Sequence, residues 1–579
     1  MNFSKLSIAC LLFFFIHYSA NAQFLRTKGT QIVNEQNEPV ILRGMGLGGW
    51  MLQEGYMFHV SNLGQQYRIR EKIVDVVGEE KTAEFYNRWL SYHTTKKDID
   101  SLAAWGFNSI RLPMHYNLYT LPVSKEPVKG KQTWLKTGFE LTDSLLSWCK
   151  ANKIYLILDL HAAPGGQGND LPISDRNPKE PSLWESKANR DKTVALWKKL
   201  AERYRNEPWI GGYDIINEPN WGFEDPKKDF RGIAENKNAP LKELLINITN
   251  AIRSVDQKHI IIIEGNGFGN NYRGVLPPWD KNMVLSFHKY GNFNNEASIS
   301  YFLKLRDQYK IPLWLGESGE NSNTWFTEAI GLVEGKQIGW AWWQLKKMGC
   351  NNPLEIKQPE GYDKLLSYWK GEGTKPSAAE AWTILQQLLE NLKIENNIYH
   401  PDVVDAMIRQ VQQTTTKPFK QHLITGASTI VLAVDYDMGR QRYAYYDTDS
   451  SRYQYTPGVE TDGNRGHIYR NDGVDIGYSE EQYFVSHTVA GEWMQYTINV
   501  AEEGNYMVAL DLRAEKEGGV VTVTVDGSST DELIVPPLTR WQIIPFAKPV
   551  HLKKGEQVMR LNVVKGGFHL RSVGFVRVR

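Results

Sequence analysis

Polar and charged side chains follow a series of apolar runs between residues 40 and 343, at the point where each run ends. If the runs are parallel strands, these ends gather at one edge of the sheet, which is where barrel enzymes carry their active sites. One such residue alone means little, and Glu264, at the end of the run IIIIEG, is set aside on that ground. Several positions converging on one mouth are more informative. They are Arg111, His161, Asn217, Glu218, His288, Tyr290, Glu317 and Trp343.

Two carboxylates that face each other across such a mouth suit the cleavage of a glycosidic bond. One carboxyl group has to be protonated to donate to the leaving oxygen, and the other has to be ionised to attack the anomeric carbon. A separation of about 5 Å gives retention through a covalent intermediate, whereas about 6.5–9.5 Å leaves room for a water molecule and gives inversion. Only the tertiary structure fixes this distance.

The elements that must position these residues are eight short apolar runs that alternate with longer amphipathic segments. The runs are apolar on both faces, as in buried parallel strands, and the segments between them have helical periodicity. This alternation predicts an α/β fold, a (β/α)8 TIM barrel over residues 23–413. A doubly wound open sheet is the alternative, but its G-x-G-x-x-G turn is missing from the first unit. The predicted strands begin near Val40, Asn108, Ile154, Gly212, Ile260, Val284, Pro312 and Ile338, and the predicted helices are 82–105, 138–152, 188–206, 240–255, 296–310 and 324–336.

The pattern changes after two further helical segments, 377–394 and 402–412. Residues 414–425, which begin with TTTKP, are predicted to be a linker. Beyond them, short alternating strands are separated by Gly, Asn and Asp turns, and this spacing predicts an all-β jelly-roll sandwich over residues 426–579. The predicted strands include 492–500, 506–514, 520–527, 557–564 and 570–578.

Residues 1–22 have the features of a secretory signal peptide. Lys5 precedes an apolar stretch from Leu6 to Ile16, and the small residues Ala20 and Ala22 stand before the predicted cleavage site. The stretch is too short to cross a bilayer. We therefore expect a secreted protein, periplasmic or extracellular, that does not span a membrane.

Charge and cysteine content limit the partners. The chain has 67 Lys and Arg against 66 Asp and Glu, so there is no electrostatic case for nucleic acid or an anionic membrane. After removal of the signal peptide, Cys149 and Cys350 are the cysteines that remain, too few for a disulfide framework or a cysteine-based metal site. Whether these two pair with each other is open at this stage.

Tryptophan is abundant, with 19 residues in 579. An uncharged partner with flat apolar faces, such as a sugar ring, would suit this composition, although packing of a large core explains it equally well. Trp50, Trp221 and Trp325 fall in predicted strand-end loops. There a sugar platform and simple loop packing are the two interpretations.

The run GYDIINEP, which contains Asn217 and Glu218, resembles the Asn-Glu-Pro signature of glycoside hydrolase family 5, a family of retaining (β/α)8 enzymes. The other strand-end residues match the family in the same order, within the sequences SIRLP, DLHAAPGGQG, SFHKY, LWLGESG and WAWW. The resemblance covers roughly residues 30–390. The opening LRGMGLGGW together with DLHAAPGGQG looks most like the β-glucan-cleaving members, which include exo-1,3-glucanases and related endoglucanases.

The resemblance implies a role for each of these strand-end residues. Glu218 would be the general acid/base and Glu317 the nucleophile, kept ionised by the nearby cation Arg111. It implies no cofactor and no metal in the barrel. The supporting roles would be binding of the sugar 2-hydroxyl by Asn217, orientation of Glu317 by Tyr290 and of Glu218 by His288, binding of a substrate hydroxyl by His161, and a stacking floor of the −1 subsite by Trp343.

Residues 426–579 resemble carbohydrate-binding module family 6, a β-sandwich, in the words VDYDMG, AYYD, YRNDGVD and GEWMQY. In this register Val434 stands where such modules carry a calcium-binding Glu. His487 and Ile544 replace two cleft aromatics that sandwich a sugar, and His569 replaces an Asn that bonds it. We expect reduced or altered sugar binding. A second binding surface on the sandwich face is the alternative, and calcium in this domain stays open.

The leading hypothesis is a secreted retaining β-glycosidase, of the glucanase or cellulase type, that acts on a β-linked polysaccharide or oligosaccharide. The same chemistry on mannan or xylan is one alternative, and a non-catalytic glycan-binding protein on an inactive barrel is another. Intact Glu218, Glu317, Arg111 and Tyr290 argue against the inactive barrel. Exo or endo action and the oligomeric state are undetermined at this stage.

Overall fold

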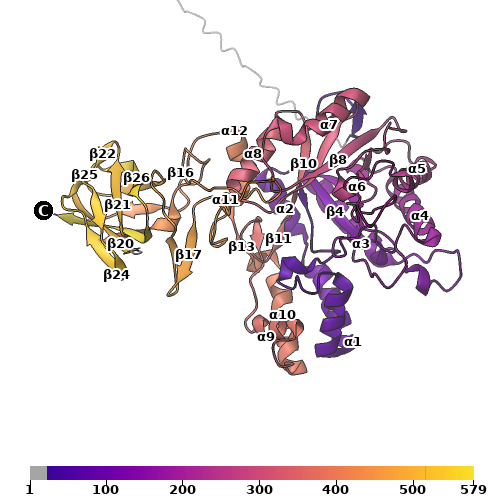
Figure 1. Cartoon of the computed structure of the whole chain (residues 1–579), viewed down its shortest axis with the longest axis horizontal. Coiled ribbons are helices and arrows are strands. Elements are labelled where there is room, and N and C mark those ends of the chain that lie inside the picture. The colour runs from indigo at the N-terminus through magenta and orange to yellow at the C-terminus, as the bar shows by residue number, and fades with distance from the viewer. Residues whose placement is uncertain (1–22, 515–516, 579) are drawn as a thin grey trace, which may run out of the picture.

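The protein consists of a barrel, a group of helices that projects from it and a two-sheet sandwich beside it (Figure 1). The structure is a computed structural model that describes residues 23–514 and 517–578. The predicted signal peptide, residues 1–22, lies outside the described residues. Among the helices of the described ranges, none combines the length and the apolar character that crossing a bilayer requires.

Eight parallel strands close into a barrel in the order β10-β3-β4-β5-β6-β7-β8-β9, which confirms the predicted (β/α)8 fold. Each strand overlaps one of the eight predicted runs. The strands are β3 (Arg43–Gly46), β4 (Ser109–His115), β5 (Tyr155–Ala162), β6 (Ile210–Asp214), β7 (Ile261–Ile263), β8 (Met283–Lys289), β9 (Leu313–Gly319) and β10 (Gly339–Trp343).

The barrel interior changes from apolar to polar toward the carboxyl ends of the strands, as β5 illustrates. On β5, Ile157 lies in an apolar cluster with Leu25 and Ile32 of the N-terminal hairpin, whose strands are β1 (Arg26–Lys28) and β2 (Gln31–Val33). Alternate residues of a strand share one face, so Asp159 and His161 follow Ile157 toward the carboxyl end. The apolar cluster fills one end of the barrel, and polar side chains meet at the other.

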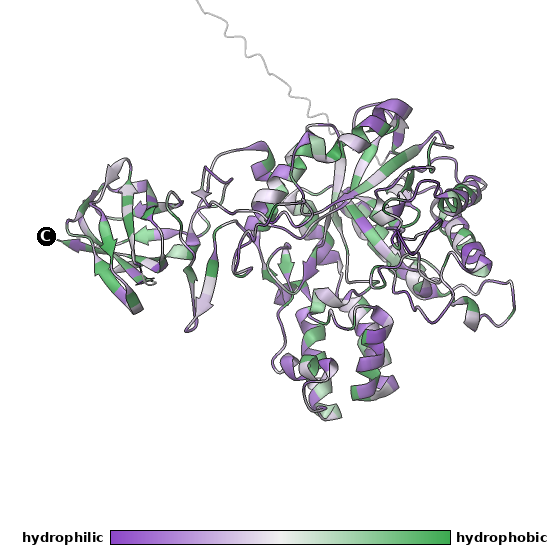
Figure 2. Ribbon diagram, viewed as in Figure 1, coloured by the Kyte–Doolittle hydropathy of each residue, from purple (hydrophilic) through white to green (hydrophobic). Residues whose placement is uncertain are grey.

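The helices that cover the barrel place their apolar faces against the strands (Figure 2). The predicted helix 82–105 is two helices, because the Thr95 backbone N–H donates to Asp98 at 2.7 Å and this capping box starts a new helix. The covering helices are α2 (Lys96–Trp105), α3 (Lys136–Asn152), α4 (Lys187–Tyr204), α5 (Ala239–Arg253), α7 (Glu296–Tyr309) and α8 (Asn323–Glu334). Helix α1 (Gln66–Tyr92) projects from the barrel, and α6 (Asn266–Gly269) is four residues long.

Helices α1, α9 (Tyr362–Lys370) and α10 (Ala378–Asn391) form the projecting group (Figure 1). Their apolar cluster includes Trp89 and Trp369 and also contains Trp343 of β10. The group therefore packs against the residue predicted as a sugar-stacking floor. The remaining elements of this half are β11 (Lys346–Lys347), β12 (Leu354–Glu355), β13 (Ile398–Tyr399), α11 (Pro401–Met407) and α12 (Arg409–Gln412).

The C-terminal region is all-β, as predicted, with two sheets around one apolar core. The sandwich begins at His422 and not at 426, because β14 pairs in parallel with β19 and thus belongs to a sheet. One sheet contains β14 (His422–Ile424), β16 (Tyr445–Tyr446), β19 (Trp493–Val500), β21 (Gly519–Val525), β22 (Ser528–Ser529), β23 (Leu533–Val535) and β26 (Gly555–Lys565). The other contains β15 (Thr429–Leu432), β17 (Ile476–Ser479), β18 (Gln482–Val485), β20 (Gly504–Ala514), β24 (Leu538–Pro545), β25 (Val550–Leu552) and β27 (Phe568–Val578).

The two cysteines that precede the sandwich are not joined. Cys149 and Cys350 are both buried free thiols. The stability of the described ranges therefore comes from the apolar clusters and the hydrogen-bond network.

Candidate active site

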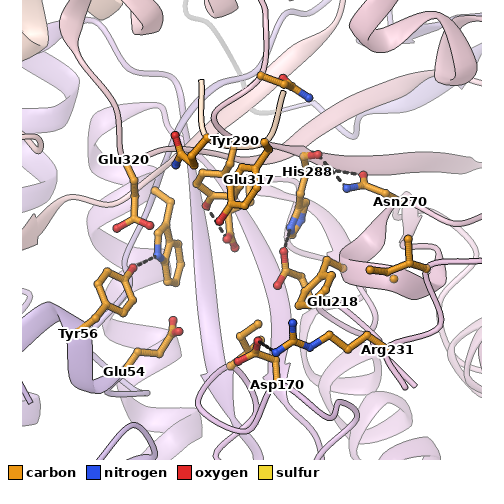
Figure 3. A pocket seen from close by; sticks show the side chains of 18 of the residues that line it. Glu54, Tyr56, Asp170, Glu218, Arg231, Asn270, His288, Tyr290, Glu317 and Glu320 are labelled. Carbon is orange, nitrogen blue, oxygen red and sulfur yellow. Dashed lines mark hydrogen bonds and ion pairs between the residues drawn. The ribbon is translucent and has the colours of Figure 1, made fainter. Parts of the chain in front are cut away.

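Two glutamates face each other at the carboxyl ends of the barrel strands (Figure 3). Glu218 follows β6 and Glu317 lies in β9, and each is 7% exposed. A carboxylate oxygen of Glu218, one of Glu317 and a ring nitrogen of His288 lie within 4.8 Å of one another. A cavity of about 640 Å³ opens above the pair, and both glutamates line it.

Glu317 accepts two hydrogen bonds, one on each carboxylate oxygen. The Arg111 guanidinium donates to Oε2 at 2.8 Å, and the Tyr290 hydroxyl donates to Oε1 at 2.7 Å. Arg111 lies in β4 and Tyr290 directly follows β8, so separate strands hold the carboxylate from two sides. These are the two neighbours that the resemblance paired with Glu317.

Glu218 is held through both its side chain and its backbone. His288 Nδ1 lies 2.6 Å from Oε1, and the Glu218 backbone N–H donates to Oε2 of Glu264 at 2.7 Å. Burial raises the pKa of Glu218, the positive charge of His288 opposes this rise, and the negative charge of Glu317 adds to it. Such a carboxyl group keeps its proton to higher pH than an exposed glutamate.

Glu264, which the sequence analysis set aside, lies directly beneath this pair and is fully buried. Its Oε1 lies 3.2 Å from His288 Nε2 and 3.2 Å from Arg111 Nη2. Burial opposes ionisation of Glu264, but the charges of His288 and Arg111 overcome it and lower the pKa. The signal in the sequence was the strand-end position of Glu264. Its contacts with Glu218, His288 and Arg111 depend on closure of the barrel.

Arg111 is the centre of a buried charge network. Its guanidinium also donates to Asp214 Oδ2, from Nε at 3.0 Å and Nη2 at 2.9 Å, and lies 3.3 Å from Asp159. Burial would lower the pKa of His288, but the carboxylates of Glu264, Glu317 and Glu218 raise it well above the usual value. Buried acids and two buried cations thus compensate each other, which is the condition for keeping charges away from water.

Of the remaining predicted residues, His161 and Trp343 line the cavity, whereas Asn217 is buried and is not among the residues that line it. Asn217 is fully buried, and its amide oxygen accepts from Arg111 at 2.7 Å. His161 stacks on Trp343, with ring centroids 5.1 Å apart and an interplanar angle of 5°, and both rings line the cavity. The Trp343 indole N–H donates to the Tyr56 hydroxyl at 2.7 Å, which fixes the plane of the indole.

Several cavity residues had no prominent signal in the sequence. Glu54, Tyr56 and Glu320 lie toward one side of the two glutamates, and Asp170 and Arg231 lie toward the other (Figure 3). Burial raises the pKa of Glu54 well above its usual value, and the neighbouring carboxylates, Glu317 first, add to the rise. Glu54 and Tyr56 follow the apolar run LRGMGLGGW, so a strand-end position was the available signal.

Of the two interpretations of Trp50, Trp221 and Trp325, packing holds for Trp50 and Trp325. Trp50 is 1% exposed and Trp325 is 0% exposed, and both indole N–H groups donate to backbone carbonyls, those of Leu90 and Asn292. Both rings belong to the apolar cluster that surrounds the barrel, and Trp325 lies in the first turn of α8 and not in a loop. Trp221 is half-buried and has the Arg176 guanidinium over its ring at 4.9 Å.

The same three donors, Glu218, His288 and Glu317, are close enough to hold a metal ion. Their surroundings do not fit one. The Arg111 guanidinium already donates to Glu317, and both ring nitrogens of His288 face carboxylate oxygens, Nδ1 at 2.6 Å from Glu218 and Nε2 at 3.2 Å from Glu264. The chemistry that the site supports is proton transfer and nucleophilic attack by carboxylates.

Comparison with known proteins gives related sequences. Residues 73–349 match the family described as Cellulase (glycosyl hydrolase family 5). The chain is 27% identical over 429 residues to "Beta-xylosidase" of Phanerodontia chrysosporium, covering 66% of this chain and 85% of that protein. It is 23% identical over 378 residues to "Endoglucanase C" of Acetivibrio thermocellus, covering 55% and 94%. It is 28% identical over 282 residues to "Probable glucan 1,3-beta-glucosidase A" of Aspergillus clavatus, covering 47% and 60%.

Proposed function

We propose that the protein is a retaining β-glycosidase that cleaves β-glucan, with a barrel that is an O-glycosyl hydrolase domain of glycosyl hydrolase family 5, the family that residues 73–349 match. The observation that carries retention is the distance between the two glutamates. A carboxylate oxygen of Glu218 and one of Glu317 lie within 4.8 Å, which leaves no room for a water molecule between nucleophile and sugar. Retaining enzymes have this spacing of about 5–5.5 Å, and inverting enzymes a wider one.

In the first step the Glu317 carboxylate attacks the anomeric carbon, and the bond to the leaving oxygen breaks. Glu218 donates its proton to that oxygen, so the leaving sugar departs as an alcohol. The burial of Glu218, which raises its pKa, supports this donor role. The hydrogen bonds from Arg111 and Tyr290 hold Glu317 in position for the attack.

In the second step water attacks the glycosyl ester of Glu317. Glu218, now a carboxylate, takes a proton from that water, and the sugar leaves with its original configuration while both glutamates return to their starting states. His161 and Trp343 line the cavity beside the pair, which supports the roles of hydroxyl binding and stacking floor. The buried amide of Asn217, fixed by Arg111, is proposed to bind the 2-hydroxyl.

The polysaccharide class is the finer part of the proposal. The β-glucan assignment is supported by the LRGMGLGGW and DLHAAPGGQG words and by relatives named endoglucanase and glucan 1,3-beta-glucosidase. Xylan is the second candidate, because another relative is named beta-xylosidase. Mannan is a further candidate, because members of the family that act on mannan share the same catalytic residues.

The sandwich is proposed to be a family 6-like module without calcium at the usual position and with an altered sugar cleft. Val434 is fully buried and offers no side-chain oxygen ligand, and Ile544 lies in β24 without the aromatic ring that stacking requires. Clear binding of a fragment of residues 419–579 to insoluble glucan would contradict the proposal of an altered sugar cleft. We also propose secretion, from the features of residues 1–22, and mass spectrometry of the mature N-terminus tests it.

A hydrolysis screen tests the enzyme proposal. The substrates are β-1,3-, β-1,4-, β-1,6- and mixed-linkage glucans, xylan and mannan, with product lengths recorded to separate exo from endo action.

Glu317→Ala should abolish turnover, and azide should rescue Glu218→Ala on an activated aryl glycoside and give the β-glycosyl azide. NMR of the first product should show the β-anomer. Glu360→Ala, at an exposed position, is the matched control. Substantial activity in Glu317→Ala, or an α-product, would refute the mechanism.

A further inference from the structure

Two residues of the C-terminal region line the same cavity as the catalytic glutamates. Gln454 and Tyr455 are on the cavity wall together with Glu218 and Glu317. They belong to the segment between β16 and β17, which is part of the sandwich region and not of the barrel. This segment therefore reaches from the second domain to the mouth of the barrel.

The first anchor of this segment lies close behind the nucleophile. Asn321, four residues after Glu317, donates from Nδ2 to the Arg452 carbonyl at 2.6 Å and accepts from the Arg452 N–H at 3.0 Å. The next residue, Ser322, donates to the Ser450 carbonyl at 2.5 Å. Reciprocal bonds of one side chain to both backbone groups of Arg452 fix the position of residues 450–452 on the barrel loop.

The second anchor lies beside Tyr290, which holds the nucleophile. The Tyr455 backbone N–H donates to the carbonyl of Gly291 at 2.8 Å. A Cβ atom on Gly291 would lie 2.5 Å from Cδ of Gln454, so the glutamine side chain packs directly on the glycine backbone. Gly291 also has a φ of 46°, in the left-handed region that glycine adopts without strain.

A buried amide network behind the two anchors makes the contact rigid. Asn471 donates from Nδ2 to the Asn321 carbonyl at 2.8 Å and to Oδ1 of Asn323 at 3.0 Å. The side chain of Asp402 accepts from the Asn471 N–H at 2.9 Å and from Asn323 Nδ2 at 2.8 Å. These residues are buried, and the amides of Asn321, Asn323 and Asn471 and one carboxylate oxygen of Asp402 are joined in one network.

Tyr455 has the properties of a sugar platform. The residue is 66% exposed although its backbone is fixed, so the aromatic ring stands at the cavity mouth and is open to a ligand. Stacking of an aromatic ring on a sugar face needs a rigid, accessible ring of this kind. His161 and Trp343 already line the cavity beside the catalytic pair, so Tyr455 is available for a different sugar unit.

We propose that Gln454 and Tyr455 form a sugar subsite of the active site. Tyr455 stacks on a sugar unit other than the one that Glu317 attacks, and Gln454 forms hydrogen bonds with the hydroxyls of that unit. This inference rests on the proposed function, because it assigns a second sugar unit to the same cavity. The C-terminal domain then contributes directly to substrate selection. The ligand class is a β-linked oligosaccharide of two or more units.

Chain-length dependence in the full-length protein tests the subsite. Tyr455→Ala should lower kcat/KM by about tenfold on oligosaccharides of three or more units. It should leave the rate on the shortest aryl glycoside that the enzyme cleaves within about twofold. Tyr455→Phe keeps the ring and should stay near wild type. Tyr443→Ala, a half-exposed tyrosine of the same domain away from the cavity wall, is the matched control.

A binding experiment separates this inference from the proposed function. In Glu317→Ala protein, calorimetry with the best trisaccharide of the hydrolysis screen should show about tenfold weaker binding when Tyr455→Ala is added. Equal binding and equal kcat/KM across chain lengths would overturn the subsite while leaving glycoside hydrolysis intact. Turnover that persists in Glu317→Ala would instead count against the catalytic mechanism.

Discussion

The Glu218 backbone N–H donates to the carboxylate of Glu264 at 2.7 Å, and Glu218 has a φ of 43°, in the left-handed region. A non-glycine residue in that region costs on the order of 1–3 kcal/mol and persists where neighbours hold it. Glu264 is such a neighbour, because it contacts Glu218, His288 and Arg111 together. The conformation of the proposed acid therefore depends on a second acid, which the neighbouring strand β7 places against it.

Glu264→Gln should reduce kcat by roughly 10–100-fold with little change in KM. The Glu264 carboxylate faces the Glu218 N–H, His288 and Arg111, which are donors, and the NH2 of a glutamine side chain would add a further donor where an acceptor is needed. The loss should be large for substrates that need a proton on the leaving group and small for a dinitrophenyl glycoside, which does not. Steady-state kinetics on both substrates checks this. An equal loss on both would mean that Glu264 acts on more than the proton donor. Glu360→Gln serves as the control.

His288→Gln should move the alkaline limb of the kcat/KM profile to higher pH. The positive charge of His288 lowers the pKa of Glu218, so its removal raises that pKa. A general acid works in its protonated form, which is lost as the pH rises through the pKa, and a higher pKa postpones that loss. The measurement is a pH series on one activated substrate. A limb that moves to lower pH would contradict the charge assignment.

Tyr290→Phe should lower kcat/KM by roughly 10–100-fold. The variant removes the donor to Oε1 of Glu317, and a hydrogen bond to a charged group contributes about 1.5–3 kcal/mol. Arg111 still donates to Oε2, so some activity should remain. Initial-rate kinetics on the preferred substrate checks the size of the loss, with Tyr443→Phe as the control. A wild-type kcat/KM in Tyr290→Phe would show that the Tyr290 hydroxyl does not contribute to catalysis.

Extensive dialysis against EDTA should leave the activity unchanged. Glu218, His288 and Glu317 could reach one ion, but Arg111 and protonated His288 supply the positive charge there. Activity and circular dichroism before and after chelation give the comparison. A loss that a divalent cation restores would show that a metal takes part.

Asn471→Ala should destabilise the contact between the sandwich and the barrel. The variant leaves the Asn321 carbonyl and Asn323 Oδ1 without this buried donor, at a cost of about 1–3 kcal/mol. The thermal midpoint should fall by roughly 2–6 °C, and Asn499→Ala, at an exposed position, should leave it unchanged. Equal midpoints for the two variants would show that the amide network adds no stability.

Much of the architecture could be predicted because its signals are local. A strand buried on both faces needs a short apolar run, and a covering helix needs apolar residues every three or four positions, so alternation of the two predicts a barrel. The same rule placed Glu218 and Glu317 at strand ends. It left open whether Trp50 and Trp325 are sugar platforms or packed rings, because side-chain packing depends on neighbours far away in the sequence.

Local sequence patterns were enough to predict the barrel, the all-β second domain and the order of polar residues at the strand ends. The tertiary structure decided the spacing of the two glutamates, the importance of Glu264 and the reach of Tyr455 into the cavity. The physical reason is that periodicity reports which face of an element is buried. Distances between side chains on different elements arise only when the barrel closes and the second domain docks beside it.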